Sequence, residues 1–204
     1  HPGIALPRDL FGMMRRNSAG LDLTDEAMLT GLSEALAATA TRPLQAAPLL
    51  ADGVADGEAR AVCNPADHRD MVGEVIDATP DVVEAALAHA EAAAPRWAET
   101  PPALRAAMLE RAADLLEARM PALLGPIVRE AGKTLANAVG EVREAVDFLR
   151  YYAAQARGFD PATHRPLGAV ACISPWNFPL AIFTGQVAAA LAAGNVVLTK
   201  PAEE

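Results

Sequence analysis

Residues 168–200 read GAVACISPWNFPLAIFTGQVAAALAAGNVVLTK, and this stretch decides the fold. Its first residues continue the apolar run LGAVACI, which indicates a buried strand. The Ala-rich segment PLAIFTGQVAAALAA is typical of a helix, which we expect to end at Gly194 in the C-cap position. NVVLTK then indicates a second short strand. Strand, crossover helix and strand in about thirty residues form a βαβ unit, so the sequence predicts a parallel sheet.

The turn ISPWNFP at residues 173–179 is unusual for a connection. Plain turns are satisfied by Gly, Asn, Asp or Ser, whereas this one places Trp176, Asn177 and Phe178 between Pro175 and Pro179. It lies at the carboxyl end of the first strand, where open α/β sheets bind their ligands. The Gly-rich dinucleotide fingerprint is missing after that strand. The turn is therefore predicted to present side chains to a ligand.

The polar side chains at this edge allow two interpretations each. Asn177 has an amide that could stabilise an oxyanion, or it could cap a helix beginning at Phe178 and Pro179. Lys200 and Glu203 could bind a phosphate or a ribose, or form an ordinary exposed pair.

The apolar residues and the cysteines are also open to a structural interpretation. Trp176 and Phe178 could line a pocket or belong to the core. Cys172, inside a strand, reads as a small buried hydrophobe, and Cys63 has no nearby His to activate it.

The rest of the chain is predicted to be mostly helical. Residues 1–60 read as an arm, with a helix from Thr24, its N-cap, to Ala40 and a loop from Thr41 to Gly57. EARAVCNP and DMVGEVIDA indicate a β-hairpin. Thr79-Pro80 and Thr100-Pro101 each signal a helix start. Further helices are expected over PALLGPIVREA, ending at Gly132, and from Thr134 to Ala156. In the latter, apolar residues at spacings of three and four share one face: Leu135, Val139, Val142, Val146 and Leu149. The charges in VREAVDFLR and LERAADLLEAR are interpreted as solvated helix faces.

Composition limits the possible functions. The net charge of −9 argues against a nucleic-acid partner, and the apolar runs are too short to span a membrane. Two distant cysteines without ligand spacing predict neither a disulfide nor a metal site, and favour a cytoplasmic location. A first residue other than Met, and an end at PAEE just after a strand, lead us to expect a piece of a longer protein.

The combination of PWNFP, Gly194-Asn195 and Lys-Pro-Ala-Glu closely resembles the start of the cofactor domain in the aldehyde dehydrogenase family. The resemblance begins at about Ala61. LPRDLFGMMRRNSAGLDL and REAGKTLANAVGEVREAVDFLRYYA are similar to bacterial bifunctional members that join a proline dehydrogenase to an L-glutamate γ-semialdehyde (Δ1-pyrroline-5-carboxylate) dehydrogenase. This implies an α/β fold, with the first βαβ of a Rossmann-like NAD-binding domain at 168–204. Residues 1–60 would be the arm from an upstream FAD-containing module.

The resemblance also implies roles for the turn. Asn177 would help form the oxyanion hole, and Phe178 would contact the aliphatic chain of the substrate. Lys200 and Glu203 would bind the adenosine ribose, and a Glu there favours NAD over NADP because it would repel a 2′-phosphate. The residues that would lie along the cofactor are Ile173, Ser174, Pro175 and Trp176.

The implied activity is oxidation of the small aldehyde to L-glutamate by a homo-oligomeric enzyme. The catalytic Cys and the general-base Glu of the family are expected beyond residue 204, so these residues alone are expected to be inactive. A dehydrogenase for another aldehyde and a non-catalytic structural module remain alternatives.

Overall fold

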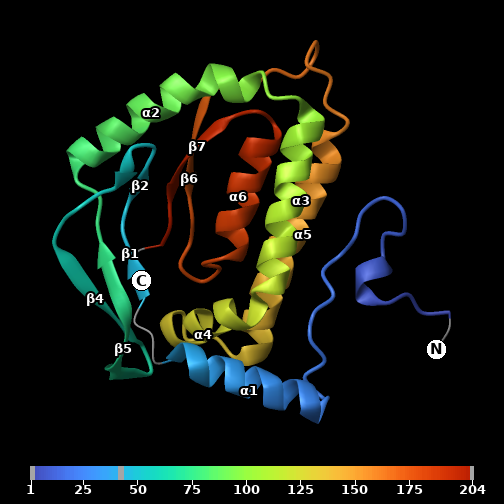
Figure 1. The fold of residues 1–204 in the computed structure, drawn as a ribbon, viewed down its shortest axis with the longest axis vertical. Helices are drawn as coiled ribbons and strands as arrows, with labels where there is room; N and C mark the ends of the chain where they lie inside the picture. The colour runs from blue at the N-terminus through green and yellow to red at the C-terminus, as the bar shows by residue number, and fades with distance from the viewer. Residues whose placement is uncertain (1–2, 41–43, 203–204) are drawn as a thin grey trace.

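The computed structural model describes residues 3–40 and 44–202, and these form a mixed α/β structure (Figure 1). This confirms the predicted fold class. The helices are η1 (Pro7–Asp9), α1 (Glu26–Ala40), α2 (Pro80–Ala98), α3 (Pro102–Ala118), α4 (Met120–Glu130), α5 (Leu135–Ala156) and α6 (Ala181–Ala192). The strands are β1 (Leu44–Ala46), β2 (Leu49–Leu50), β3 (Gly53–Val54), β4 (Ala59–Asn64), β5 (Asp67–Ile76), β6 (Ala169–Ile173) and β7 (Val196–Lys200).

The predicted βαβ unit is present. Strands β6 and β7 pair in parallel, with Ile173 opposite Lys200 at their carboxyl ends, and α6 connects them. The helix ends one residue before its C-cap, Ala193, and Gly194 follows with a φ of +88°. Glycine suits that position because a side chain disfavours the left-handed region.

The predicted hairpin is also present, as the antiparallel pair β4 and β5. The prediction of a plain loop up to Gly57 is wrong for the described part of that segment, because β1 pairs in parallel with β5, and β2 and β3 form a small antiparallel pair. A Cβ atom at Gly73 would lie 2.3 Å from the backbone oxygen of Leu44. The close approach of β1 therefore requires a glycine in β5.

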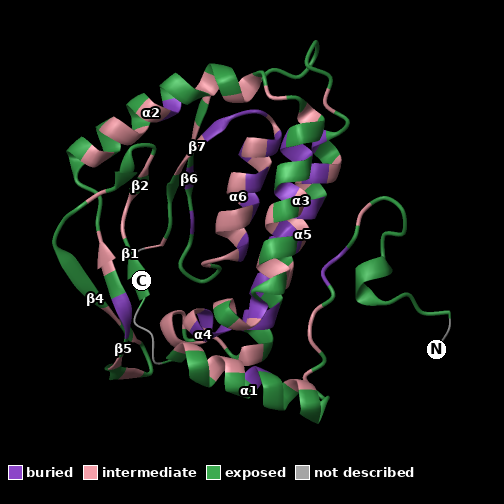
Figure 2. Ribbon diagram, in the orientation of Figure 1, coloured by how far each residue is buried: buried purple, intermediate pink, exposed green. Residues whose placement is uncertain are grey.

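The hydrophobic core lies among the helices (Figure 2). Helix α5 packs against α3, α4 and α6, and its residues Val142, Ala145 and Val146 are completely buried. Helix α1 packs on α4, at the bottom of the view in Figure 1. The predicted apolar stripe of α5 is thus the centre of the packing, and Thr134 caps this helix by accepting a hydrogen bond from Asn137 N–H (3.3 Å).

Two predicted helix starts need correction. Helix α1 begins at Glu26, and its cap is Asp25, whose Oδ1 accepts from Ala27 N–H (2.9 Å) and Met28 N–H (3.2 Å). Thr24 instead donates its hydroxyl to Asp22. Helix α3 begins at Pro102 with Pro101 as N-cap, and the hydroxyl of Thr100 donates instead to the backbone oxygen of Arg96 in α2. By contrast, Thr79 and Pro80 start α2 as predicted.

The prediction that the charged residues of α3 and α5 form solvated helix faces also needs correction. Arg150 is 4% exposed, and its guanidinium donates to Glu117 (2.7 Å) and Asp114 (2.9 Å). Burial opposes ionisation of both groups. Burial is the largest single influence on each group, but the hydrogen bonds and opposite charges around them together outweigh it, so the pKa of Glu117 is lowered and the pKa of Arg150 is raised.

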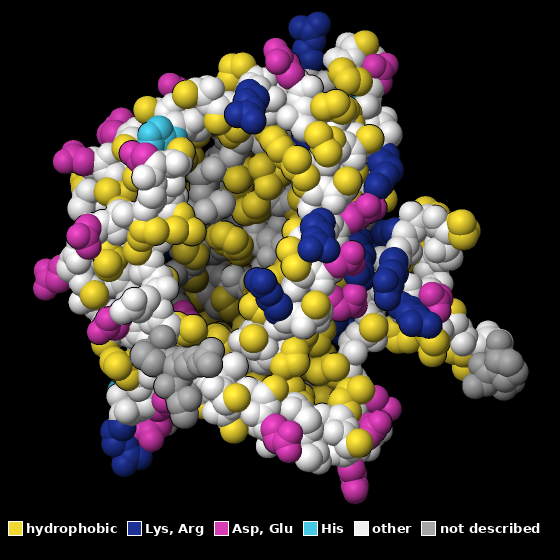
Figure 3. Space-filling view, viewed as in Figure 1, with side chains coloured by type: hydrophobic (Ala, Val, Ile, Leu, Met, Phe, Trp, Pro, Cys, Tyr) yellow, Lys and Arg dark blue, Asp and Glu magenta, His cyan; other side chains and the backbone are white. Residues whose placement is uncertain are grey.

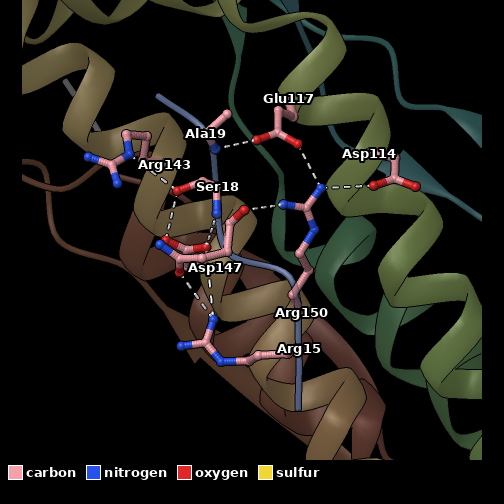
Figure 4. Close-up of polar contacts among 9 residues, drawn as sticks. Arg15, Ser18, Ala19, Asp114, Glu117, Arg143, Asp147 and Arg150 are labelled. Atoms are coloured by element: carbon pink, nitrogen blue, oxygen red, sulfur yellow. Dashed lines mark hydrogen bonds and ion pairs between the residues drawn. The ribbon is translucent and has the colours of Figure 1, made fainter. Parts of the chain in front are cut away.

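These charges hold part of the N-terminal segment in place (Figure 4). Arg150 also donates to the backbone oxygen of Asn17, and Glu117 accepts from Ala19 N–H. Ser18 is fully buried and donates both its N–H (2.7 Å) and its hydroxyl (2.8 Å) to the carboxylate of Asp147. Residues 17–19 are therefore docked on α3 and α5 by charge-assisted hydrogen bonds.

Candidate functional site

The turn between β6 and α6 is held at its start by two anchors. Ser174 N–H donates to Lys200 O (3.1 Å), which extends the β6–β7 pairing into the turn. The Ser174 hydroxyl donates to Gln186 Oε1 (3.2 Å), while Gln186 Nε2 donates to the backbone oxygen of Ile173 (3.1 Å). Ser174 is 6% exposed, so its side chain faces α6 and stabilises the turn from inside.

Asn177 lies outside the helix that it was alternatively predicted to cap. Helix α6 begins at Ala181, and its N-cap is Leu180. Asn177 is exposed in the middle of the turn, at the carboxyl edge of the parallel strands. Its amide therefore stands where a ligand at this edge would meet it.

The apolar residues of this edge are exposed, not part of the core. Ile173 is 68% exposed, Trp176 59% and Phe178 41%. Such a cluster of large exposed hydrophobic side chains indicates a contact surface. Pro175, between Ile173 and Trp176 in the turn, is exposed as well.

The end of the turn is held by two residues that sequence reasoning missed. Glu141 in α5 accepts hydrogen bonds at Oε2 from Ala181 N–H (2.9 Å) and Leu180 N–H (3.3 Å). Its Oε1 accepts from Lys133 Nζ at 2.6 Å. The same ammonium group lies 4.4 Å from the ring centroid of Phe178, a cation–π contact. The available signal was the place of Glu141 on the buried face of α5, three residues after Ala138 and four before Ala145.

A cavity of about 510 Å³ lies next to the turn. Its lining comes from the β4–β5 turn, α4, the turn before α6 and the end of β7: Pro65, Pro126, Ile127, Glu130, Ala131, Trp176, Pro179, Leu180, Pro201 and Ala202. Glu130 is the one ionisable side chain of this lining, and burial raises the pKa of its carboxyl. Figure 3 shows that the molecule is hollowed between α2 and α6, with hydrophobic side chains gathered in the hollow.

The remaining predicted residues divide into three cases. Lys200 ends β7 at the same edge as the turn, opposite Ile173. Glu203 lies outside the described residues. Cys172 is 4% exposed, and burial raises the pKa of its thiol, so the interpretation as a buried hydrophobe is confirmed.

Comparison with known proteins identifies the family of the chain. The model of the "Aldehyde dehydrogenase family" matches residues 54–204. The "Bifunctional protein PutA" of Escherichia coli (strain K12) is 62% identical over 205 residues, which covers 100% of this chain and 16% of that protein. The chain thus spans about a sixth of the length of this relative.

Two solved structures have the same fold. Proline utilization A (PutA) from Bdellovibrio bacteriovorus, inactivated by N-propargylglycine, gives a TM-score of 0.84 at 33% identity and covers 92% of this chain and 21% of the other. The 1-pyrroline-5-carboxylate dehydrogenase from Thermus with bound NAD gives a TM-score of 0.83 at 33% identity, over 92% of this chain and 40% of the other.

Proposed function

The chain belongs to the aldehyde dehydrogenase family, and from this premise we propose that the protein carrying it oxidises L-glutamate γ-semialdehyde to L-glutamate with NAD. The semialdehyde is the open form of Δ1-pyrroline-5-carboxylate. The complete protein would be a bifunctional enzyme of proline catabolism, and this chain would supply one edge of its aldehyde site.

One observation carries the choice of substrate. The 62% identity to PutA extends over the whole chain, including residues 1–53, which precede the match to the general family model. A dehydrogenase for an unrelated aldehyde has no reason to keep this preceding segment. Its residues 17–19 are docked on α3 and α5, so the segment is part of the structure that supports the proposed site.

The described residues fit a nicotinamide cofactor. The exposed side chains of Ile173 and Trp176, at the carboxyl end of a parallel strand, offer an apolar surface for a flat ring system. Lys200 at the end of β7 offers a cation to hydroxyl or phosphate groups, and we propose that Glu203 takes part in binding the ribose. When bound, NAD would accept the hydride from the substrate.

Asn177 is the residue of this chain to which we assign a catalytic role. Addition of a thiolate to the aldehyde carbonyl converts its oxygen into an oxyanion, and the Asn177 amide would donate a hydrogen bond to it. Phe178 would contact the aliphatic chain of the substrate. Cys172 is buried with a raised thiol pKa, and Cys63 lies in β4 of the hairpin, not at the β6–β7 edge. We therefore propose that the nucleophilic Cys and the general-base Glu of the family lie outside these residues.

The test is NADH formation by the complete protein, followed at 340 nm, with the semialdehyde and a panel of other aldehydes. We expect a strong preference for the semialdehyde, and a fall in kcat of about 10²- to 10³-fold in Asn177→Ala. Asn137→Ala, which removes an exposed amide on α5, is the matched control and should retain full turnover. Absence of NADH from every aldehyde with folded protein would refute the proposal.

The organisation of the complete protein is proposed on the same basis. Residues 1–60 would lead from an FAD-containing proline dehydrogenase module into the aldehyde dehydrogenase module, in a cytoplasmic homo-oligomer. In the described part of the chain, no helix has both the length and the hydropathy needed to span a bilayer. Size-exclusion chromatography with light scattering, and the flavin absorbance of the purified protein, would test these points.

A further inference from the structure

Glu141 caps a helix to which it does not belong. The first N–H groups of α6 need acceptors, but Leu180, at the N-cap, has an apolar side chain and makes no side-chain cap hydrogen bond. The carboxylate of Glu141, from α5, takes that place and also complements the positive end of the helix dipole. Its side chain is 1% exposed, so water is nearly excluded from the contact.

Lys133 gives this buried carboxylate its counter-charge. A buried charge is tolerated only when it is paired and hydrogen-bonded, and the Lys133 side chain, 14% exposed, supplies both interactions. Its ammonium group also lies over the Phe178 ring. One ion pair therefore contacts the turn on both sides of Pro179: Phe178 before it, and Leu180 and Ala181 after it.

We propose that the Lys133–Glu141 pair positions Asn177 for oxyanion stabilisation, an inference that rests on the proposed function. The start of the turn is fixed by Ser174 through Lys200 and Gln186, and its end by Glu141. Asn177 lies between these anchors, next to the ring that Lys133 contacts. An oxyanion donor is effective only when it is held in place before the charge develops, so loosening one anchor weakens the donor.

The substitution Glu141→Gln tests this with little change in shape. The amide oxygen of Gln can still accept from Ala181 N–H, but the amide group no longer offsets the charge of Lys133. The Lys133 side chain is then free to leave the Phe178 ring, while α6 keeps an acceptor at its N-terminus. We expect the protein to fold and the turn to lose its fixed geometry.

The experiment is a double-mutant cycle in the complete protein, using Glu141→Gln, Asn177→Ala and the double variant, with kcat and KM measured from NADH formation. If Glu141 acts through Asn177, Glu141→Gln lowers kcat by about tenfold or more in the wild-type background, with both KM values within about twofold. In the Asn177→Ala background it has no further effect. Equal losses of kcat in the two backgrounds would mean that Glu141 is merely structural and would overturn the inference.

Two further variants guard against a simple folding defect. Lys133→Met should lower kcat as Glu141→Gln does, and Lys133→Arg should restore most of it because it keeps the charge. Glu110→Gln, which breaks the exposed pair with Arg157, is the control and should leave kcat unchanged. Full activity of Lys133→Met would overturn the inference. Absence of NADH from the wild-type protein would refute the proposed function itself, and with it any catalytic role for the turn.

Discussion

Removal of the Asp147 carboxylate should release the docked N-terminal segment. In Asp147→Ala, the N–H and the hydroxyl of the completely buried Ser18 lose their acceptor (Figure 4). Hydrogen bonds to a charged group contribute about 1.5–3 kcal/mol each, so the two together contribute about 3–6 kcal/mol. The Asp147 side chain is 25% exposed, so in the variant water can enter the space left by the carboxylate and recover part of this hydrogen-bonding free energy. We therefore expect a loss of about 2–4 kcal/mol in the docking free energy.

Native-state hydrogen exchange measures this docking directly. The amides of Ser18 and Ala19 should exchange about 30- to 1,000-fold faster in Asp147→Ala, since about 1.4 kcal/mol corresponds to a factor of ten. Amides in the middle of α5 should change much less, because the segment can detach while the helix core stays folded. Asp9→Ala, which breaks an exposed pair with Arg8, is the control and should change exchange at Ser18 by less than about fivefold. Unchanged exchange at Ser18, or an equal increase throughout α5, would refute this account.

Three other substitutions test the fold. Arg129 lowers the pKa of Asp70 from 3.8 to about 2. The pair should therefore stabilise the fold above about pH 4, and this stabilisation should be lost as the pH falls towards 2. In Asp70→Asn, the denaturant midpoint should no longer show this acid-dependent decrease. Gly185→Ala would place a Cβ 2.9 Å from the Phe148 ring and should cost about 1–3 kcal/mol of unfolding free energy in urea titrations, whereas an unchanged midpoint would show that α6 can shift. Thr134→Ala should remove the cap of α5 at a cost of about 1 kcal/mol by the same assay, and no cost would contradict its capping role.

The sequence predicted those helices and strands that are determined by residues close together in the chain. Thr79-Pro80 and Thr134 start helices because capping involves only the next few residues. The βαβ unit was also predictable, since a parallel pair joined by a helix follows from the order of apolar runs. Strand β1 was not predictable from the sequence. Leu44–Ala46 is too short to show an alternation of apolar and polar residues, and it forms a strand only by pairing with β5, about thirty residues further along the chain.

The burial of charged residues likewise depends on segments that are distant in the sequence. The charged residues in VREAVDFLR were interpreted as solvated because charged side chains on an amphipathic helix usually face the solvent. Arg150 is nevertheless buried, since its partners Asp114 and Glu117 come from α3, and the N-terminal segment covers it from outside. Nothing within α5 reveals that two other segments supply acceptors. Helix periodicity therefore predicted which face is apolar, but not which charges the tertiary structure encloses.

The availability of the Asn177 side chain depends on the sequence of the turn and also on a residue far away in the chain. If α6 began at Phe178, Asn177 would be its natural cap, and its side chain would be occupied by backbone N–H groups. The helix begins later, at Ala181, and Glu141 from α5 supplies the acceptor that the N-terminus needs. Capping from another helix thus leaves the Asn177 amide outside the helix, at the ligand edge of the sheet. The turn sequence predicted a polar group there, but its availability depends on a carboxylate about forty residues away in the chain.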